Sequence, residues 1–198
     1  MVPITSQDIT AIVLCGGEGR RMGGADKPLV LFRGMPLVQH VIDGLHHAVG
    51  DIVIVANRSF DAYRALGYRV ILDEKTGLGP LGGIAAAAPH VTTPWAFICA
   101  GDTPFIESAL VKRLADHASA ESRVARVAHD GERLQPLFAL VSDSVLATAP
   151  NHLESQSLSV REWLVSQGAV AVDATDLGAC MISIDNPEQL RALELRAP

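Results

Sequence analysis

Aromatic residues and cysteines are scarce in this chain of 198 residues. Aromatic residues make up 5% of the chain against 48% for all apolar residues, so Leu, Val, Ile and Ala must fill most of the core. Cys15, Cys99 and Cys180 are far apart and lie in apolar runs. We therefore expect small buried side chains at these positions, and neither a disulfide framework nor a zinc site.

Long apolar runs and an excess of positive charge are also lacking. No apolar run approaches the roughly 20 residues of a membrane-spanning helix, and residues 1–10 have no segment typical of a signal peptide. The formal net charge of −6 argues against a general nucleic-acid binder, which needs Lys and Arg to displace counterions. We expect a cytoplasmic protein that binds neither membrane nor nucleic acid.

The spacing of apolar residues predicts alternating strands and helices. Short runs rich in β-branched residues predict strands at 9–15, 52–56, 69–72 and 95–100. Apolar residues three and four apart, with shorter apolar segments between strands, predict helices at 36–49, 60–66, 81–88 and 107–118. Such alternation indicates a parallel sheet covered on both faces. We expect one domain, 1–198, with a Rossmann-like three-layer α/β/α fold.

The second half of the chain is less regular. Residues 123–128 and 135–141 flank a turn at Asp130 and Gly131, which predicts an antiparallel hairpin added to a mostly parallel, twisted sheet. The remaining predicted elements are a helix at 158–167, a strand at 179–184 and a helix at 187–195, capped by Asn186 and with Pro187 in its first turn.

A glycine-rich segment with interleaved cations follows the first predicted strand. Between Leu14 and Lys27 the segment contains Gly16, Gly17, Gly19, Arg20, Arg21, Gly23 and Gly24. Glycines let backbone N–H groups approach phosphate oxygens, and cations neutralise their charge. The segment matches neither a Walker loop nor a dinucleotide fingerprint. A flexible surface loop is the alternative, but three cations directly after an apolar strand favour anion binding.

Polar side chains follow the ends of the next three predicted strands. These residues are Asn57, Asp73 and Asp102. The carboxyl ends of parallel strands share one edge of a sheet, where open α/β folds bind ligands, so we expect all three beside the glycine-rich segment. Asp102 is either a magnesium ligand or a helix cap. Glycines at 77–83 either wrap a base or form a tight connection.

These motifs resemble the molybdenum cofactor guanylyltransferases of the nucleotidyltransferase superfamily. The resemblance covers most of the chain, and the double glycine at 16–17 with Arg-Arg-Met-Gly-Gly is similar to the guanylyl branch rather than the cytidylyl one. The segments that carry it are 14–17, 20–24, 26–27, 56–58, Asp73, 79–83 and 101–104, with weaker similarity at 135–141 and 186–188.

The resemblance implies a role for each matching residue. It implies GTP contacts in the part up to about residue 105, and a pterin site in the rest. The implied GTP-binding residues are Leu14, Cys15, Gly16, Gly17, Lys27, Asn57, Asp73, Gly79, Pro80, Leu81, Gly82 and Asp102. The implied catalytic residues are Lys27, Arg21 and Asp102, with Asp102 also binding Mg²⁺.

The implied reaction transfers GMP from GTP to the phosphate of molybdopterin and releases pyrophosphate, with molybdoenzyme-maturation proteins as further candidate partners. The alternatives are a CTP donor or sugar-phosphate acceptor, and a non-enzymatic cofactor-delivery protein. Three departures stand out. Cys15 replaces the family's usual alanine, 156–159 lacks a Gly-x-Arg signature, and Ser183 and Asp185 interrupt an asparagine pattern. The last two put the pterin contacts in question.

Overall fold

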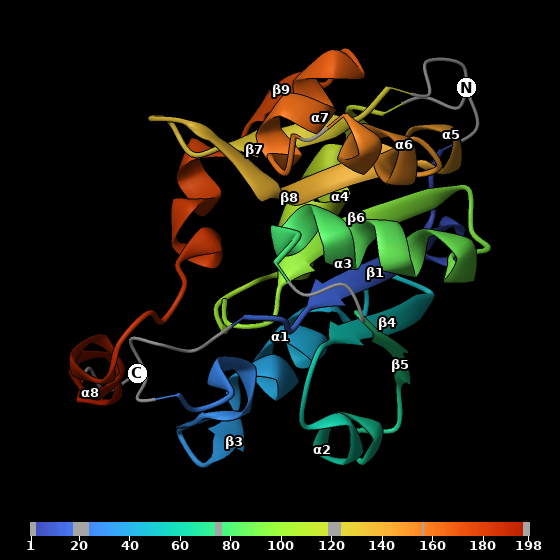
Figure 1. Ribbon diagram of the computed structural model, residues 1–198. Coiled ribbons are helices and arrows are strands. Elements are labelled where there is room, and N and C mark those ends of the chain that lie inside the picture. Colours follow the sequence, from blue (N-terminus) through green and yellow to red (C-terminus); the bar gives the residue numbers. More distant parts are fainter. Residues whose placement is uncertain (1–2, 18–23, 74–76, 119–123, 156, 196–198) are drawn as a thin grey trace.

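The computed structural model describes residues 3–17, 24–73, 77–118, 124–155 and 157–195. Its centre is a seven-stranded sheet (Figure 1) with the order β5-β4-β1-β6-β8-β7-β9. The strands are β1 (Ile9–Leu14), β4 (Asp51–Ala56), β5 (Arg69–Leu72), β6 (Trp95–Ala100), β7 (Arg126–His129), β8 (Leu134–Ser142) and β9 (Val170–Asp173). The four strands predicted in the first half are confirmed.

The sheet is mostly parallel with an antiparallel portion, as the sequence predicts. Strands β5, β4, β1 and β6 run parallel to one another. Strand β8 is antiparallel to both β6 and β7, which confirms the hairpin around Asp130, and β9 is parallel to β7. Strand β8 pairs with β6 of the parallel half on one side and with its hairpin partner β7 on the other, so both halves of the chain share one sheet.

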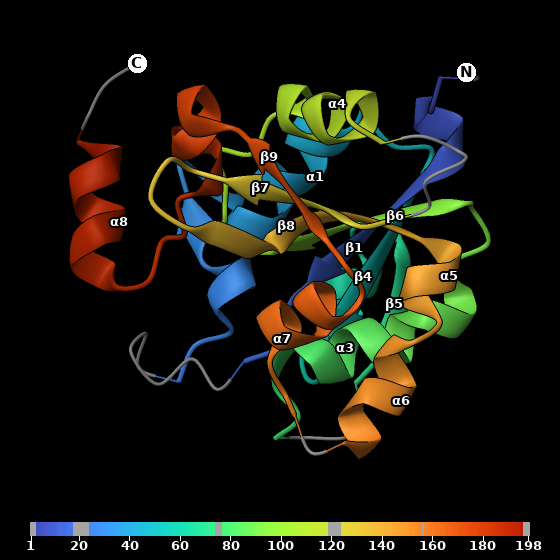
Figure 2. The same ribbon diagram turned by 90° about the horizontal axis from the view of Figure 1, so that it is seen from above.

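Helices cover both faces of the sheet and create two cores. One core joins alternate residues of β1 to α1 (Leu37–Leu45) and α4 (Ser108–Asp116), and the other joins the intervening Ile12 to α3 (Gly79–Ala87), α6 (Ala149–Glu154) and α7 (Val160–Ser166). Figure 2 shows α1 and α4 on one side and α3, α6 and α7 on the other. Side chains of successive strand residues point to opposite faces, so one apolar strand supplies both cores. The three-layer prediction is confirmed.

The remaining elements are short. They are η1 (Ser6–Asp8), η3 (Lys27–Leu29), β2 (Leu31–Phe32), β3 (Met35–Pro36), α2 (Phe60–Arg64), η4 (Ala88–His90), α5 (Asp143–Leu146), η5 (Thr175–Met181) and α8 (Pro187–Glu194). Asn186 caps α8 by accepting a hydrogen bond from the Gln189 N–H, as predicted. Among the described helices, none is both long and apolar enough to cross a membrane.

The strand predicted at 179–184 is wrong. Its first residues belong to the 3-10 helix η5, and the edge strand is instead β9, which was not predicted. A short apolar run does not distinguish a strand from another buried segment. Here Cys180, Met181 and Ile184 are buried without pairing in the sheet, and Ile184 packs with Phe32 and Leu37 in a small separate core.

Gly44 allows α1 to pack closely against the chain before α4. A Cβ atom built at Gly44 would lie 2.1 Å from the Ile106 carbonyl oxygen. Gly44→Ala should therefore lower the free energy of unfolding by about 1–3 kcal/mol, although alanine favours helices. Thermal unfolding of this variant and of His46→Ala, an exposed neighbour, measures the effect. An unchanged or raised Tm for Gly44→Ala would contradict this packing.

Candidate active site

One large pocket opens at the carboxyl ends of the parallel strands. Its volume is about 950 Å³, within the usual range for small-molecule sites. The sequence-predicted site residues that line it are Leu14, Gly16, Gly17, Asn57, Asp73, Gly79, Pro80 and Asp102. Six of them come from the ends of four neighbouring strands, and Gly79 and Pro80 come from the start of α3. The sheet edge thus brings together residues up to 88 positions apart in the chain, as the strand order predicts.

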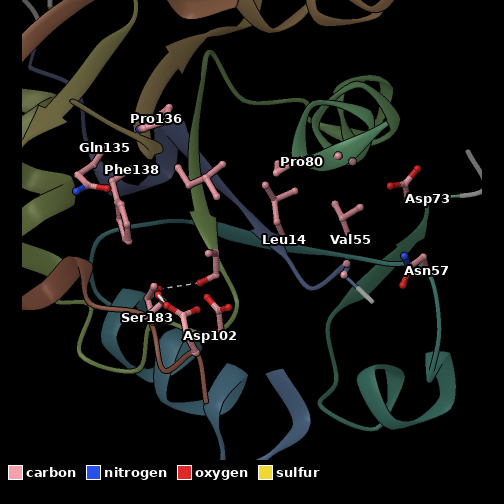
Figure 3. Close-up of a pocket in the computed structure, with 18 of the residues that line it drawn as sticks. Leu14, Val55, Asn57, Asp73, Pro80, Asp102, Gln135, Pro136, Phe138 and Ser183 are labelled. Atoms are coloured by element: carbon pink, nitrogen blue, oxygen red, sulfur yellow. Dashed lines mark hydrogen bonds between the residues drawn. The ribbon is translucent and has the colours of Figure 1, made fainter. Parts of the chain in front are cut away.

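Asn57 and Asp73 lie toward one side of this pocket (Figure 3). Asn57 follows β4, and its Oδ1 atom is buried with no hydrogen-bond partner among the described residues. A buried amide oxygen without a partner is costly, so this atom is suited to accept a hydrogen bond from a ligand. Asp73 follows β5, and its N–H donates to the Ala56 carbonyl at 2.9 Å.

The first turn of α3 forms the wall next to Asp73. Gly79 and Pro80 line the pocket, whereas Leu81 is fully buried in the core and Gly82 is not part of the lining. The N-terminal turn of a helix carries unpaired N–H groups and a partial positive charge, which favours anions. The glycines at 77–83 thus lie at the start of α3, as the interpretation of a tight connection predicts, and Gly77, Gly79 and Gly83 line the pocket. Contact of this segment with a base stays a prediction.

Asp102 lies at the other side of the pocket and is paired with Lys27. The Lys27 Nζ atom is 2.5 Å from Asp102 Oδ2 and 2.5 Å from Asp185 Oδ1. Burial lowers the pKa of Lys27, but the two carboxylates outweigh this effect and the net pKa is raised. Lys27 therefore remains a cation over the physiological pH range. It does not line the pocket itself but lies behind Asp102 in η3.

Gly101 lets the end of β6 approach the end of β1. A Cβ atom at Gly101 would lie 2.5 Å from Cys15 Sγ and 3.2 Å from the Leu14 carbonyl oxygen. Cys15 is buried beneath the pocket, and its N–H donates to the Val55 carbonyl at 2.7 Å. Of the implied GTP-binding residues, four are therefore next to the lining and not part of it: Cys15, Lys27, Leu81 and Gly82.

Asp102 and Asp185 are neighbouring pocket carboxylates that could hold a magnesium ion. Magnesium usually takes one or two carboxylates and completes its shell with water and substrate phosphates. The two carboxylates converge on the same Lys27 Nζ atom, and Asp102 and Asp185 both line the pocket. Within the described part of the chain, no group of three or more His, Cys, Asp or Glu side chains could form a metal cage. Arg20 and Arg21 lie outside the described residues.

Several lining residues were not predicted as site residues. They are Val55, Arg58, Ala100, Thr103, Arg133, Gln135, Pro136, Leu137, Phe138, Met181, Ser183 and Asp185, whereas Gly77 and Gly83 also line the pocket and belong to the predicted glycine segment at 77–83. Figure 3 shows Gln135, Phe138 and Ser183 across the pocket from Asn57 and Asp73. The interrupted asparagine pattern at 183–185 is the feature of the sequence that points to Ser183 and Asp185 on this side of the pocket. Arg133 gave none, because only the folded hairpin brings it to the pocket.

Comparisons with known proteins match this chain to one family. Residues 11–171 match the family described as the MobA-like NTP transferase domain. The molybdenum cofactor guanylyltransferase of Shewanella piezotolerans is 35% identical over 187 residues, covering 93% of this chain and 91% of the relative. The enzyme of the same name from Vibrio campbellii is 35% identical over 179 residues, covering 90% and 91%.

Solved structures share the fold at lower identity. Molybdopterin-guanine dinucleotide biosynthesis protein A from Archaeoglobus fulgidus has a TM-score of 0.76 at 22% identity, covering 94% of this chain and 97% of that one. 4-Diphosphocytidyl-2C-methyl-D-erythritol synthase from Anaerococcus prevotii has a TM-score of 0.74 at 12% identity, covering 96% of each chain. The extended sequence matches show that this chain belongs to the molybdenum cofactor guanylyltransferase family and is a nucleotidyltransferase.

Proposed function

We propose that this enzyme transfers GMP from GTP to the terminal phosphate of molybdopterin, releasing pyrophosphate and forming molybdopterin guanine dinucleotide. The observation that supports this most is the division of one pocket into two sides. Asn57 and Asp73 lie on one side, Gln135 and Phe138 on the other, and Asp102 lies on the pocket wall with Lys27 behind it. A nucleotide that extends from the Asn57 side toward Asp102 would bring its phosphates to this charged pair, next to the side proposed for the acceptor.

The nucleotide would occupy the side formed by the first half of the chain, up to about residue 105. The unpartnered Oδ1 of Asn57 can accept a hydrogen bond from the base or ribose, and the first turn of α3 carries N–H groups suited to anions. The pterin acceptor would occupy the side that includes Gln135, Phe138 and Ser183. Phe138 supplies an apolar surface there, suited to a flat ring.

The proposed reaction is an in-line displacement at the α-phosphorus of GTP. A phosphate oxygen of the acceptor forms a new P–O bond, and the bond to pyrophosphate breaks. The nucleophile is already an anion, so positioning and charge neutralisation suffice without a strong general base. Asp102 would hold magnesium against the phosphates, while Lys27 and Arg21 would balance charge on the reacting and leaving groups.

Label transfer tests the proposal directly. Purified protein would be incubated with GTP labelled at the α-phosphate, magnesium and molybdopterin, with labelled CTP as a parallel donor. Label appearing in the dinucleotide from GTP and not from CTP supports both donor and acceptor. Transfer from CTP would replace the donor, and GTP binding without transfer would point to another acceptor such as a sugar phosphate.

Arg133 should contribute to acceptor binding. It lies on the β7–β8 hairpin and lines the pocket on the side proposed for the acceptor. Asp130 stabilises the turn, because its carboxylate accepts hydrogen bonds from the N–H groups of Glu132 and Arg133. Arg133→Ala should raise the KM for molybdopterin about tenfold, the loss of one charge-assisted contact, and leave the KM for GTP unchanged.

Steady-state kinetics with each substrate varied in turn measures the KM for molybdopterin and the KM for GTP separately. Arg161→Ala is the matched control, because Arg161 is an exposed arginine in α7 that does not line the large pocket. An Arg133→Ala enzyme whose KM for molybdopterin equals that of the wild type would remove Arg133 from the acceptor site.

A further inference from the structure

Arg58 binds the segment that leads into Lys27. Its Nη1 and Nη2 groups donate to the carbonyl oxygens of Gly24 and Ala25, at 3.0 and 2.8 Å. Its Nε atom faces Asp26 Oδ2 at 3.6 Å. One guanidinium thus contacts three consecutive residues, 24–26, that lie more than 30 positions away in the sequence. A planar guanidinium with several donors in a fixed geometry is suited to this kind of contact.

Tyr63 holds the other oxygen of Asp26. The Tyr63 hydroxyl donates to Asp26 Oδ1 at 2.9 Å, and the Tyr63 side chain is fully buried in the core. Burial raises the pKa of Tyr63 well above its ordinary value, and the nearby Cys15 and Asp26 raise it further, so the hydroxyl remains a donor. We call Asp26, Arg58 and Tyr63 together the Asp26 clasp.

The facing atoms of Asp26 and Arg58 are shielded from solvent and have few other polar partners. The side chains of Asp26 and Arg58 are 9% and 33% exposed. Asp26 Oδ2 and Arg58 Nε are both buried, and neither has a hydrogen-bond partner among the described residues. The opposite charge is therefore the main partner of each atom. Removing the Arg58 charge leaves the buried Asp26 carboxylate without its opposite charge, which is more costly than breaking an exposed pair.

The clasp connects two parts of the active site through the backbone. Asp26 directly precedes Lys27, whose Nζ atom is paired with Asp102. Arg58 directly follows Asn57, which lines the opposite side of the pocket. The carbonyl of Asp26 also accepts a hydrogen bond from the Leu29 N–H at 2.9 Å, which fixes the short helix η3 that carries Lys27. A shift of Asp26 would therefore displace Lys27.

We propose that Asp26, Arg58 and Tyr63 are positioning residues that fix Lys27 relative to Asn57, and so set the distance between the phosphate and nucleoside ends of the bound nucleotide. This inference rests on the proposed function in that the nucleotide spans the two sides. Asp26 and Tyr63 act through Lys27, and Arg58, which itself also lines the pocket, holds the 24–26 segment relative to Asn57. Misplacement of a reacting group by about 1 Å can reduce a rate about 100-fold, so small displacements at Asp26 matter.

The experiment is a double-mutant cycle on turnover with Asp26→Asn and Arg58→Met. Each single change should reduce kcat about 10- to 100-fold, and the double variant should be little worse than either, because the two side chains act as one unit. Arg58→Lys keeps the charge but cannot contact both carbonyls, and should recover part of the loss. Tyr63→Phe removes only the hydroxyl and should lower kcat less than Asp26→Asn.

Asp61 and Arg64 provide a matched control. This pair lies in the same part of the chain and has the same 3.6 Å separation, but its side chains are 102% and 60% exposed. The corresponding cycle with Asp61→Asn and Arg64→Met should leave kcat and the KM for GTP unchanged, with no coupling. Thermal unfolding of every variant separates a loss of folded protein from a loss of rate.

If Asp26 and Arg58 have a purely structural role, their variants will have a lower Tm, but the folded protein will keep the wild-type kcat and the wild-type KM for GTP. This result overturns the proposal. Additive effects of Asp26→Asn and Arg58→Met on kcat would also overturn it. If Arg58→Met does not fold, Arg58→Lys and Asp26→Asn carry the same cycle.

Turnover and nucleotide binding of the wild-type enzyme show whether the proposed function itself is wrong. If it transfers a nucleotide only from CTP, the proposed donor is wrong, and the cycle is measured with CTP. If it binds GTP without transfer, the GTP dissociation constant replaces kcat, and weakening with coupling between the two changes supports the clasp. A wild-type protein that neither turns over nor binds either nucleotide overturns both proposals.

Discussion

Asp102→Asn is expected to lower kcat by about two to three orders of magnitude, the loss measured when one electrostatic group is removed from other active sites. The change removes one negative charge at a point where both Lys27 and a magnesium ion would depend on it. Asp102 Oδ2 is 2.5 Å from Lys27 Nζ, and Asp102 lines the pocket directly after β6. Asparagine keeps the size of the side chain, so packing around Thr103 and Gly101 should be preserved.

Magnesium titration of the variant distinguishes a metal ligand from a structural carboxylate. If Asp102 binds the metal, the magnesium concentration that gives half-maximal turnover should rise, and binding of GTP without metal should change little. Asp116→Asn is the control, because Asp116 is exposed at the end of α4. Wild-type turnover of Asp102→Asn at limiting magnesium would exclude Asp102 as the metal ligand.

Lys27→Met is expected to cost a similar factor in kcat, about 100-fold, and also to destabilise the protein. Lys27 is 17% exposed and lies between Asp102 and Asp185, so its loss leaves two carboxylates facing each other without a cation. Two like charges so close repel each other, which lowers the stability of the folded protein. Lys27→Arg should retain part of the activity, because the charge remains but the donor geometry differs.

The pH dependence of stability tests the same pairing. The folded-state pKa of Lys27 is raised above 10.5, its ordinary value. The stability that this pairing contributes is therefore fully present below about pH 10.5 and is lost as the pH rises through the higher folded value. Urea unfolding of wild type and Lys27→Met at several pH values, with exposed Lys112→Met as the control, measures it. A constant difference across pH 9–12 would contradict the pairing.

The helices and strands of the first half follow from the sequence because their signals are local. Strands β1, β4, β5 and β6 are short apolar runs, buried on both faces in β1 and β6, and α1 buries one regular stripe of apolar residues. The failures occur in the second half. The run at 179–184 has the composition of a strand, yet Met181 packs in the core with α1 and α4, and Ile184 packs in the small separate core, both without sheet pairing. Burial and strand pairing produce the same composition, so only the fold distinguishes them.

The sequence by itself also determined which residues end the parallel strands, and hence that Asn57, Asp73 and Asp102 share one edge with the glycine-rich segment. That inference needs only the direction of the chain in a parallel sheet. The tertiary structure decided which side chains meet across that edge. It paired Lys27 with Asp185, 158 positions away, and Arg58 with Asp26. It also brought the β7–β8 hairpin to the pocket and placed Leu81 in the core instead of the pocket lining. Contacts between distant segments depend on how helices and hairpins pack, and no periodicity within a segment encodes that packing.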